Sequence, residues 1–129
     1  MPKIDRKLIS KKVEVIANLK KIIIAENVLD HEDELRPFET DALSAYKQKP
    51  LAVVFPKNTK EVSEILAYCN REKIKIVPRG AGTGLSGGAL PLEDGILLCL
   101  GKFNKIINID YKNRCVVAQP GVTNLSITQ

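Results

Sequence analysis

The sequence concentrates its glycines in one short stretch, and glycines in such a pattern are suited to binding an anion. Five of the eight glycines lie between Gly80 and Gly88. Glycine loses more conformational freedom on folding than any other residue, so this cluster indicates a backbone that turns sharply or lets a ligand approach closely. Arg79 precedes the cluster, and Thr83 and Ser86 add hydroxyl donors within it. Successive backbone N–H groups in this setting predict a cradle for a diphosphate.

Two alternatives stay open for this stretch. The glycines could instead form a flexible loop between two strands, although loops usually carry fewer of them. Arg79 could pair with a phosphate, or it could brace the loop through backbone carbonyls.

The spacing of the glycines separates three kinds of phosphate-binding loop. The ATPase loop needs Lys and then Ser or Thr after its last glycine. Gly82 and Gly87 have the required spacing, but Gly88 and Ala89 follow them. Gly82, Gly84 and Gly87 also match G-x-G-x-x-G, a motif that works when its glycines open a helix. Too few residues follow for a helix, so the spacing favours a strand-to-strand loop that offers backbone amides.

The net charge of +5 comes from the N-terminal segment. Residues 1–25 hold seven basic and two acidic side chains, which gives +5, and the remaining residues hold thirteen of each sign. Aromatic residues make up 5% of the chain and Trp is absent, so bases have few side chains to stack on. A balanced body with few aromatics predicts no nucleic-acid partner.

The cysteines and the single histidine predict neither a disulfide framework nor a metal site. Cys69, Cys99 and Cys115 are odd in number and widely spaced. They are typical of reduced, mostly buried cysteines in a cytoplasmic protein. His31 has no second histidine or nearby cysteine with which to share a metal.

An amphipathic helix is predicted over residues 5–25. Its apolar positions recur at helical spacing, with lysines between them: Ile9, Val13, Ile16, Leu19 and Ile23. Packing against its own protein is the favoured interpretation. Contact with a membrane surface and a targeting presequence are the alternatives.

The rest of the chain predicts a mixed fold of strands and helices. Apolar runs indicate strands at residues 51–55, 74–77, 95–100, 105–110 and 115–118, the last two as a hairpin. Asn58 caps a helix with Glu61 as its partner, and this helix makes the first two strands a parallel βαβ unit. Thr123 could cap a final turn, which is too short to be stable in isolation. The apolar strand at residues 96–100 is expected to need a partner element over an exposed edge.

At the glycine stretch the sequence resembles the FAD-linked oxidases with a PCMH-type (vanillyl-alcohol-oxidase-type) FAD-binding domain, most of all the glycolate oxidase FAD-binding subunit and D-lactate dehydrogenases. The resemblance covers about residues 30–129, including residues 37–46 and 50–56. Its strongest part is the pyrophosphate loop, Pro78, Arg79, Gly80, Ala81, Gly82, Thr83, Gly84, Leu85, Ser86, Gly87, Gly88 and Ala89. Gln119, Pro120, Gly121 and Val122 are similar to a turn that passes near the flavin nucleotide.

The resemblance implies an α+β fold. A lead-in with the basic helix would occupy residues 1–49. The first, incomplete part of the FAD-binding domain would occupy residues 50–129. The cofactor would be FAD, bound through residues 78–88 and 120–122, and the reaction would be oxidation of a 2-hydroxy acid of the glycolate or D-lactate type.

Members of the resembled family are several times longer than this chain. Their substrate domain has no counterpart here, so the resemblance assigns no catalytic residue and no metal ligand to this sequence. We therefore expect a truncated FAD-binding portion that does not catalyse alone, completed by a separately encoded remainder. The alternative is a non-catalytic docking module or the remnant of a truncated or split gene.

Overall fold

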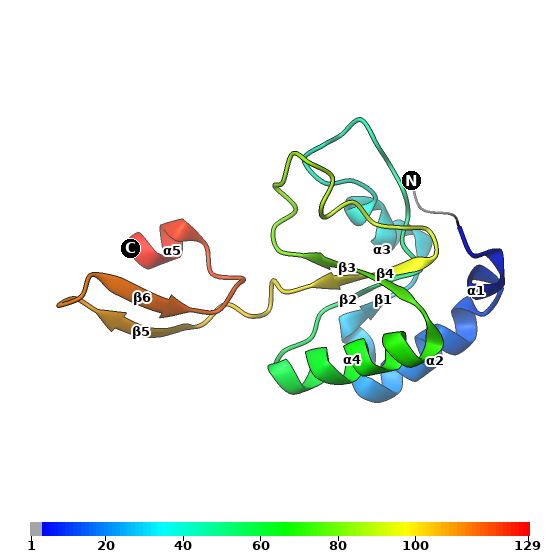
Figure 1. Cartoon of the computed structure of the whole chain (residues 1–129), viewed down its shortest axis with the longest axis horizontal. Helices are drawn as coiled ribbons and strands as arrows, with labels where there is room; N and C mark the ends of the chain where they lie inside the picture. Colours follow the sequence, from blue (N-terminus) through cyan, green and yellow to red (C-terminus); the bar gives the residue numbers. More distant parts are fainter. Residues whose placement is uncertain (1–3) are drawn as a thin grey trace.

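A four-stranded sheet forms the centre of the structure, a computed structural model that describes residues 4–129. In spatial order its strands are β1 (Val28–Leu29), β2 (Ala52–Val54), β4 (Gly95–Cys99) and β3 (Lys75–Arg79). Both β2 and β3 run parallel to β4, with Val53 and Val77 on either side of Leu97, whereas β1 is antiparallel to β2. The predicted parallel orientation of β2 and β3 is confirmed, with β4 lying between them (Figure 1).

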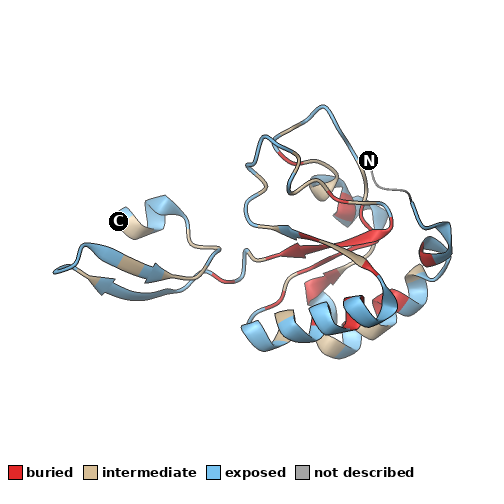
Figure 2. Cartoon of the chain, viewed as in Figure 1, coloured by how far each residue is buried: buried red, intermediate tan, exposed pale blue. Residues whose placement is uncertain are grey.

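The expectation that residues 96–100 expose an edge is wrong. All five residues of β4 are buried, because strands on both sides and layers on both faces cover it (Figure 2). A continuous apolar run of this kind is typical of the central strand of a parallel sheet.

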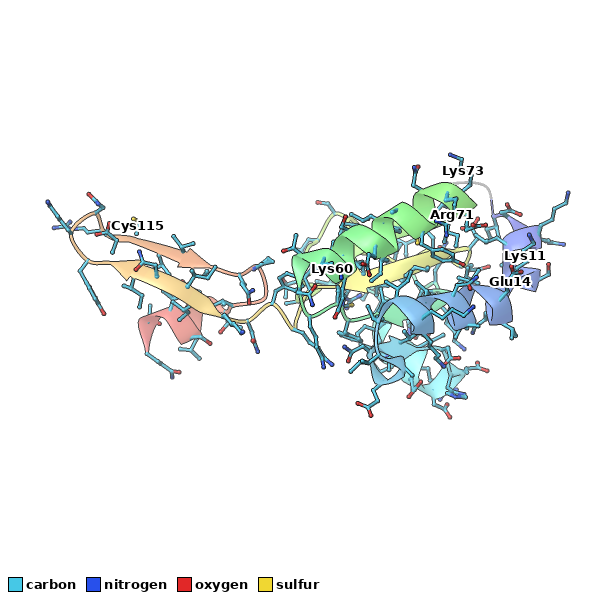
Figure 3. The ribbon with its side chains drawn as sticks, turned by 90° about the horizontal axis from the view of Figure 1, so that it is seen from below. Lys11, Glu14, Lys60, Arg71, Lys73 and Cys115 are labelled. Atoms are coloured by element: carbon cyan, nitrogen blue, oxygen red, sulfur yellow. The ribbon has the colours of Figure 1, made fainter. Side chains whose placement is uncertain are left out.

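Helix α4 (Thr59–Glu72) connects β2 to β3 and covers one face of the sheet. Asn58 caps it by accepting the Glu61 N–H, as predicted, and the Glu61 carboxylate accepts the Lys57 N–H one residue earlier. The C-cap of the helix is Lys73, which adopts the left-handed conformation. Its charged side chains, such as Lys60 and Arg71, lie on the outer surface (Figure 3).

The N-terminal helix is divided in two, which corrects the single helix predicted for residues 5–25. Helix α1 (Arg6–Ser10) and helix α2 (Lys12–Ile22) meet at Lys11, whose backbone leaves the helical conformation. Asp5 caps α1 by accepting the N–H groups of the next turn. Leu8 of α1 and the buried residues of α2 belong to the same core.

The buried apolar side chains differ from the predicted stripe. Val13 is 82% exposed and Ile9 lies at the surface, although both belong to the predicted apolar stripe. Leu8 and Val15 are buried in their place, and they belong to the same core as Leu19. The remaining predicted positions are buried in the core: Ile16, Leu19 and Ile23.

The favoured interpretation of this segment, a helix packed on its own protein, agrees with the structure. Helix α2 contacts α4 and β1, and its buried side chains belong to the same core as β2 and β4. The domain boundary predicted at residue 50 stays a prediction. Residues on both sides of it belong to that core. No helix within residues 4–129 is long and apolar enough to cross a membrane.

The opposite face of the sheet is covered by short elements that periodicity did not predict. These are α3 (Glu32–Leu35) and η2 (Arg36–Phe38), whereas the short η1 (Ala25–Asn27) contacts α2. Leu35 packs on this face against Val53 and Leu97, with Phe38 beside them. His31 caps α3, so the single histidine has a structural place at a helix end.

The predicted hairpin is confirmed and projects from the body (Figure 1). It consists of β5 (Ile106–Asp110) and β6 (Cys115–Ala118), paired antiparallel. Asp110 closes the turn by accepting from the Asn113 N–H and side-chain amide. The short helix α5 (Asn124–Thr128) follows with Thr123 as its cap.

Candidate functional site

The glycine loop, defined here as residues 80–89, begins where β3 ends and lies at the carboxyl end of the parallel strands (Figure 1). Residues 80–94 form bends and turns between β3 and β4 with no helix among them. The prediction of a strand-to-strand loop is confirmed. In open sheets of this kind, ligands bind outside the carboxyl ends of the strands.

The glycines of this loop fall into two groups. Gly82 and Gly87 have positive φ angles, +74° and +73°, which other residues rarely adopt. Gly80, Gly84 and Gly88 have open space around the position of a side chain, with no heavy atom within 4 Å. The first group shapes the backbone, and the second leaves room for a ligand to approach it.

The amide groups of the glycine loop are available to a ligand. Within residues 4–129, no backbone N–H from Gly80 to Ala89 donates a hydrogen bond to the protein. Two of the loop's carbonyls are used, since Gly82 accepts the Ala42 N–H at 2.9 Å and Gly87 accepts the Leu90 N–H at 3.2 Å. Donors without acceptors beside open space fit the oxygens of a diphosphate.

Arg79 makes bracing contacts. Its Nη1 donates to the carbonyl of Thr40 at 2.7 Å, and its guanidinium lies over the ring of Phe38, 5.8 Å from the centroid. A Cβ built on Gly82 would come within 2.6 Å of the Arg79 Cζ. The guanidinium therefore occupies the place that a side chain at Gly82 would need, and of the two roles considered these contacts support the brace.

Asp41 is a buried residue beside the loop that the sequence motifs did not single out. Its side chain is almost fully buried, and Oδ1 accepts the Leu43 N–H at 2.9 Å. Oδ2 is buried with no hydrogen-bond partner within residues 4–129. In the sequence, Asp41 could have been recognised only as a candidate for an Asx-turn, in which an Asp side chain accepts the N–H two residues later.

The second predicted segment, residues 120–122, is anchored at the same end of the sheet. The Gly121 N–H donates to the carbonyl of Phe103 at 2.7 Å, and a Cβ on Gly121 would lie 2.6 Å from the Leu100 carbonyl oxygen. The Leu100 N–H in turn donates to the Arg79 carbonyl at 2.9 Å. Pro120 and Val122 flank this contact, so the fold connects both predicted segments through the end of β4.

Comparison with known proteins identifies the family. Residues 50–129, more than half of the chain, match the FAD-binding domain family. The chain belongs to this family. Its structural neighbours are PCMH-type flavoproteins, and its cofactor is FAD. The resemblance noted in the sequence is confirmed, as is the α+β fold with a small mixed sheet.

Among curated proteins, the chain is 44% identical over 129 residues to the glycolate oxidase subunit GlcD of Escherichia coli K12, covering 100% of this chain and 25% of that protein. It is 35% identical over 106 residues to the mitochondrial D-2-hydroxyglutarate dehydrogenase of Arabidopsis thaliana, covering 82% and 19%. The chain thus spans about a quarter of the length of the curated relatives it matches.

Among solved structures, p-cresol methylhydroxylase with substrate bound aligns with a TM-score of 0.78 at 27% identity, covering 97% of this chain and 24% of that one. Alkyldihydroxyacetonephosphate synthase aligns with a TM-score of 0.76 at 17% identity, which shows the fold alone.

Proposed function

We propose that this chain holds the diphosphate of FAD on the glycine loop and serves as the FAD-binding portion of an oxidoreductase that acts on a 2-hydroxy acid of the glycolate or D-lactate type. The observation that carries the proposal is the row of backbone N–H groups from Gly80 to Ala89 that have no acceptor among residues 4–129. The relatives named after glycolate and D-2-hydroxyglutarate support the substrate class.

In this proposal the contacts to FAD come from residues 78–88 and 120–122. The amides of the loop bind the diphosphate oxygens, and the hydroxyls of Thr83 and Ser86 add donors at an exposed surface. Gly121 keeps residues 120–122 close to the end of β4. When bound, the flavin supplies the hydride acceptor, and the chain's own residues supply binding and orientation.

Titration of the full chain with FAD, followed by flavin fluorescence, tests the proposal. Gly84→Val fills open space in the loop and is expected to weaken FAD binding at least about tenfold, since the ligand must approach the backbone there. Ala67→Val is the matched control, because Ala67 is exposed on α4 and lies outside both proposed segments. ADP should compete with FAD and FMN should not, since FMN lacks a diphosphate.

Two outcomes would contradict this proposal. Binding of FAD no tighter than millimolar would show that the chain does not hold the cofactor by itself. Equal losses in Gly84→Val and Ala67→Val would show that the loop is not the site.

We further propose that a separately encoded polypeptide supplies what the relatives carry in the rest of their length. Support comes from the hairpin and the following helix α5, where apolar side chains are exposed to solvent: Ile107 is 65% exposed, Val117 52% and Leu125 64% (Figure 2). Surfaces of this kind usually mark an interface. Without such a partner, much of the flavin would remain in water, so we expect no oxidase activity from this chain alone.

A complementation experiment tests the partner. The chain is mixed with the part of the E. coli glycolate oxidase subunit that follows the matched quarter, and modification of the exposed Cys115 on the hairpin is followed (Figure 3). Association should protect Cys115 and tighten FAD binding, and Ile107→Asp should abolish both effects. Unchanged Cys115 reactivity with a folded partner fragment would favour a docking module or a remnant.

A cytoplasmic location is proposed from the thiols. Cys69 and Cys99 are buried and free, and Cys115 is free on the surface. Unpaired cysteines of this kind persist in reducing compartments. Fractionation of cells that express the chain tests this location.

A further inference from the structure

We propose that Arg79 is a positioning residue, which holds the glycine loop in its binding conformation through Phe38, Thr40 and Gly82 and does not pair with the diphosphate. The inference rests on the proposed function for the identity of the ligand. The brace itself is a property of the protein without FAD.

The guanidinium of Arg79 is held on more than one side. Its Nη1 donates to the Thr40 carbonyl at 2.7 Å, and its Cζ lies over the Phe38 ring at 5.8 Å from the centroid. The Gly82 backbone lies against it, with the ideal Cβ position 2.6 Å from Cζ and Nε. A planar guanidinium can stack and donate at once, which a lysine ammonium cannot do.

The contacts around Arg79 also fix the segment that supports the loop. The Ala42 N–H donates to the Gly82 carbonyl at 2.9 Å, and Leu43 lies 3.6 Å from the Cβ position of Gly87. Residues 40–43 therefore touch both glycines that have positive φ angles. Because Arg79 binds Thr40 at one end of this segment, its guanidinium joins the segment to the loop.

The charge of Arg79 has no carboxylate partner within residues 4–129. The Thr40 carbonyl and the Phe38 ring face are the groups that compensate it. If the guanidinium left these groups for a phosphate, it would vacate the space beside Gly82. Retaining the brace during binding costs no such rearrangement, which is the advantage of preorganisation.

Two substitutions separate positioning from pairing. Arg79→Lys keeps the charge and loses the plane, whereas Arg79→Gln loses the charge. Positioning predicts that both weaken FAD binding by a similar factor of about ten. Direct pairing predicts that Arg79→Lys stays within about threefold of the wild type while Arg79→Gln loses much more. That second pattern would overturn the proposal.

A third variant, Phe38→Leu, removes the ring under the guanidinium while keeping an apolar side chain. Positioning predicts a loss of FAD affinity of about threefold to tenfold, with the unfolding midpoint changed by no more than a conservative core substitution allows. Unchanged affinity in Phe38→Leu would contradict the brace.

A measurement without FAD keeps the proposal testable if the chain does not bind the cofactor. Hydrogen exchange of the Ala42 N–H reports its bond to Gly82, and Arg79→Gln should accelerate this exchange at least about tenfold relative to amides in α4. Unchanged exchange at Ala42 would overturn the brace. Weak FAD binding by the wild type, with accelerated exchange in Arg79→Gln, would contradict only the proposed function.

Discussion

At the scale of single residues, Gly82 meets two constraints at once. Its φ of +74° is one that side-chain-bearing residues rarely adopt, and the Arg79 guanidinium lies where its Cβ would be. We expect Gly82→Ala to lower the free energy of unfolding by about 1–3 kcal/mol, measured by urea denaturation. Gly80→Ala, in open space, should change it by less than about 1 kcal/mol. Equal stability of the two variants would show that the brace tolerates a side chain.

Asp94 is a second residue whose contribution to stability can be measured, because it joins the start of helix α1 to the sheet. Its Oδ2 accepts from Lys75 Nζ at 2.6 Å and from the Asp5 N–H at 2.6 Å. Burial by itself raises the pKa of Asp94, but the bonds from Lys75 and Asp5 outweigh it and hold the pKa below its ordinary value of 3.8. The ionised carboxylate is therefore the form that the fold favours.

The sign of the pH dependence follows from this lowered pKa. The stabilisation by Asp94 is complete above about pH 4, the ordinary range of an aspartate, and is lost as the pH falls through the folded-state pKa. We expect Asp94→Asn to lower the free energy of unfolding by about 2 kcal/mol at pH 6. The difference from the wild type should shrink in urea titrations carried out below pH 4. A difference that stays constant with pH would contradict this account.

At the scale of elements, helix α2 offers two apolar positions with different surroundings. Leu19 is fully buried and Val13 is 82% exposed, although both lie on the predicted apolar stripe. We expect Leu19→Ala to cost about 2–5 kcal/mol and Val13→Ala less than about 0.5 kcal/mol, measured by thermal or urea unfolding. A small effect of Leu19→Ala would mean that α2 is a detachable presequence or surface helix.

Much of the architecture could be predicted because strong local signals agree with the fold. Strands β2, β3 and β4, helix α4 and the hairpin all follow from apolar runs, an N-cap and turn residues. The break at Lys11 could not be predicted, because the apolar periodicity continues across it. The two-residue β1 is too short to show any period.

The candidate site was predictable to a similar degree. The glycine spacing indicated a loop without a helix. Each competing motif needs particular residues or a helix after its glycines, and the sequence shows directly that these do not follow. The role of Arg79 could not be read, since Thr40 and Phe38 approach it from some forty residues away in the sequence. Asp41 was missed for the same reason, as its burial depends on tertiary contacts.

At the scale of the whole molecule, the three cysteines distinguish the body from the hairpin, because two are buried in the body and one is exposed on the hairpin. Burial raises the pKa of Cys69 to about 12, and it raises that of Cys99 to about 11 although Arg79 acts against it. Cys115 is exposed on β6. We expect a thiol reagent at pH 8 to modify one cysteine in the folded chain and all three in denaturant, because the thiolate is the reactive form. The variant Cys115→Ser should remove the fast reaction, and rapid modification of two or more thiols in the folded wild type would contradict the buried body.

The anchoring of Gly121 on the carbonyls of Leu100 and Phe103 has a mechanical consequence. The hairpin projects from the body, and this contact lies where the hairpin joins it (Figure 1). Because the Leu100 N–H is bonded to the carbonyl of Arg79, a force on the hairpin tip near Asn113 reaches the residue before the glycine loop through only a few bonds. A polypeptide that binds the hairpin would therefore act on the glycine loop without touching it.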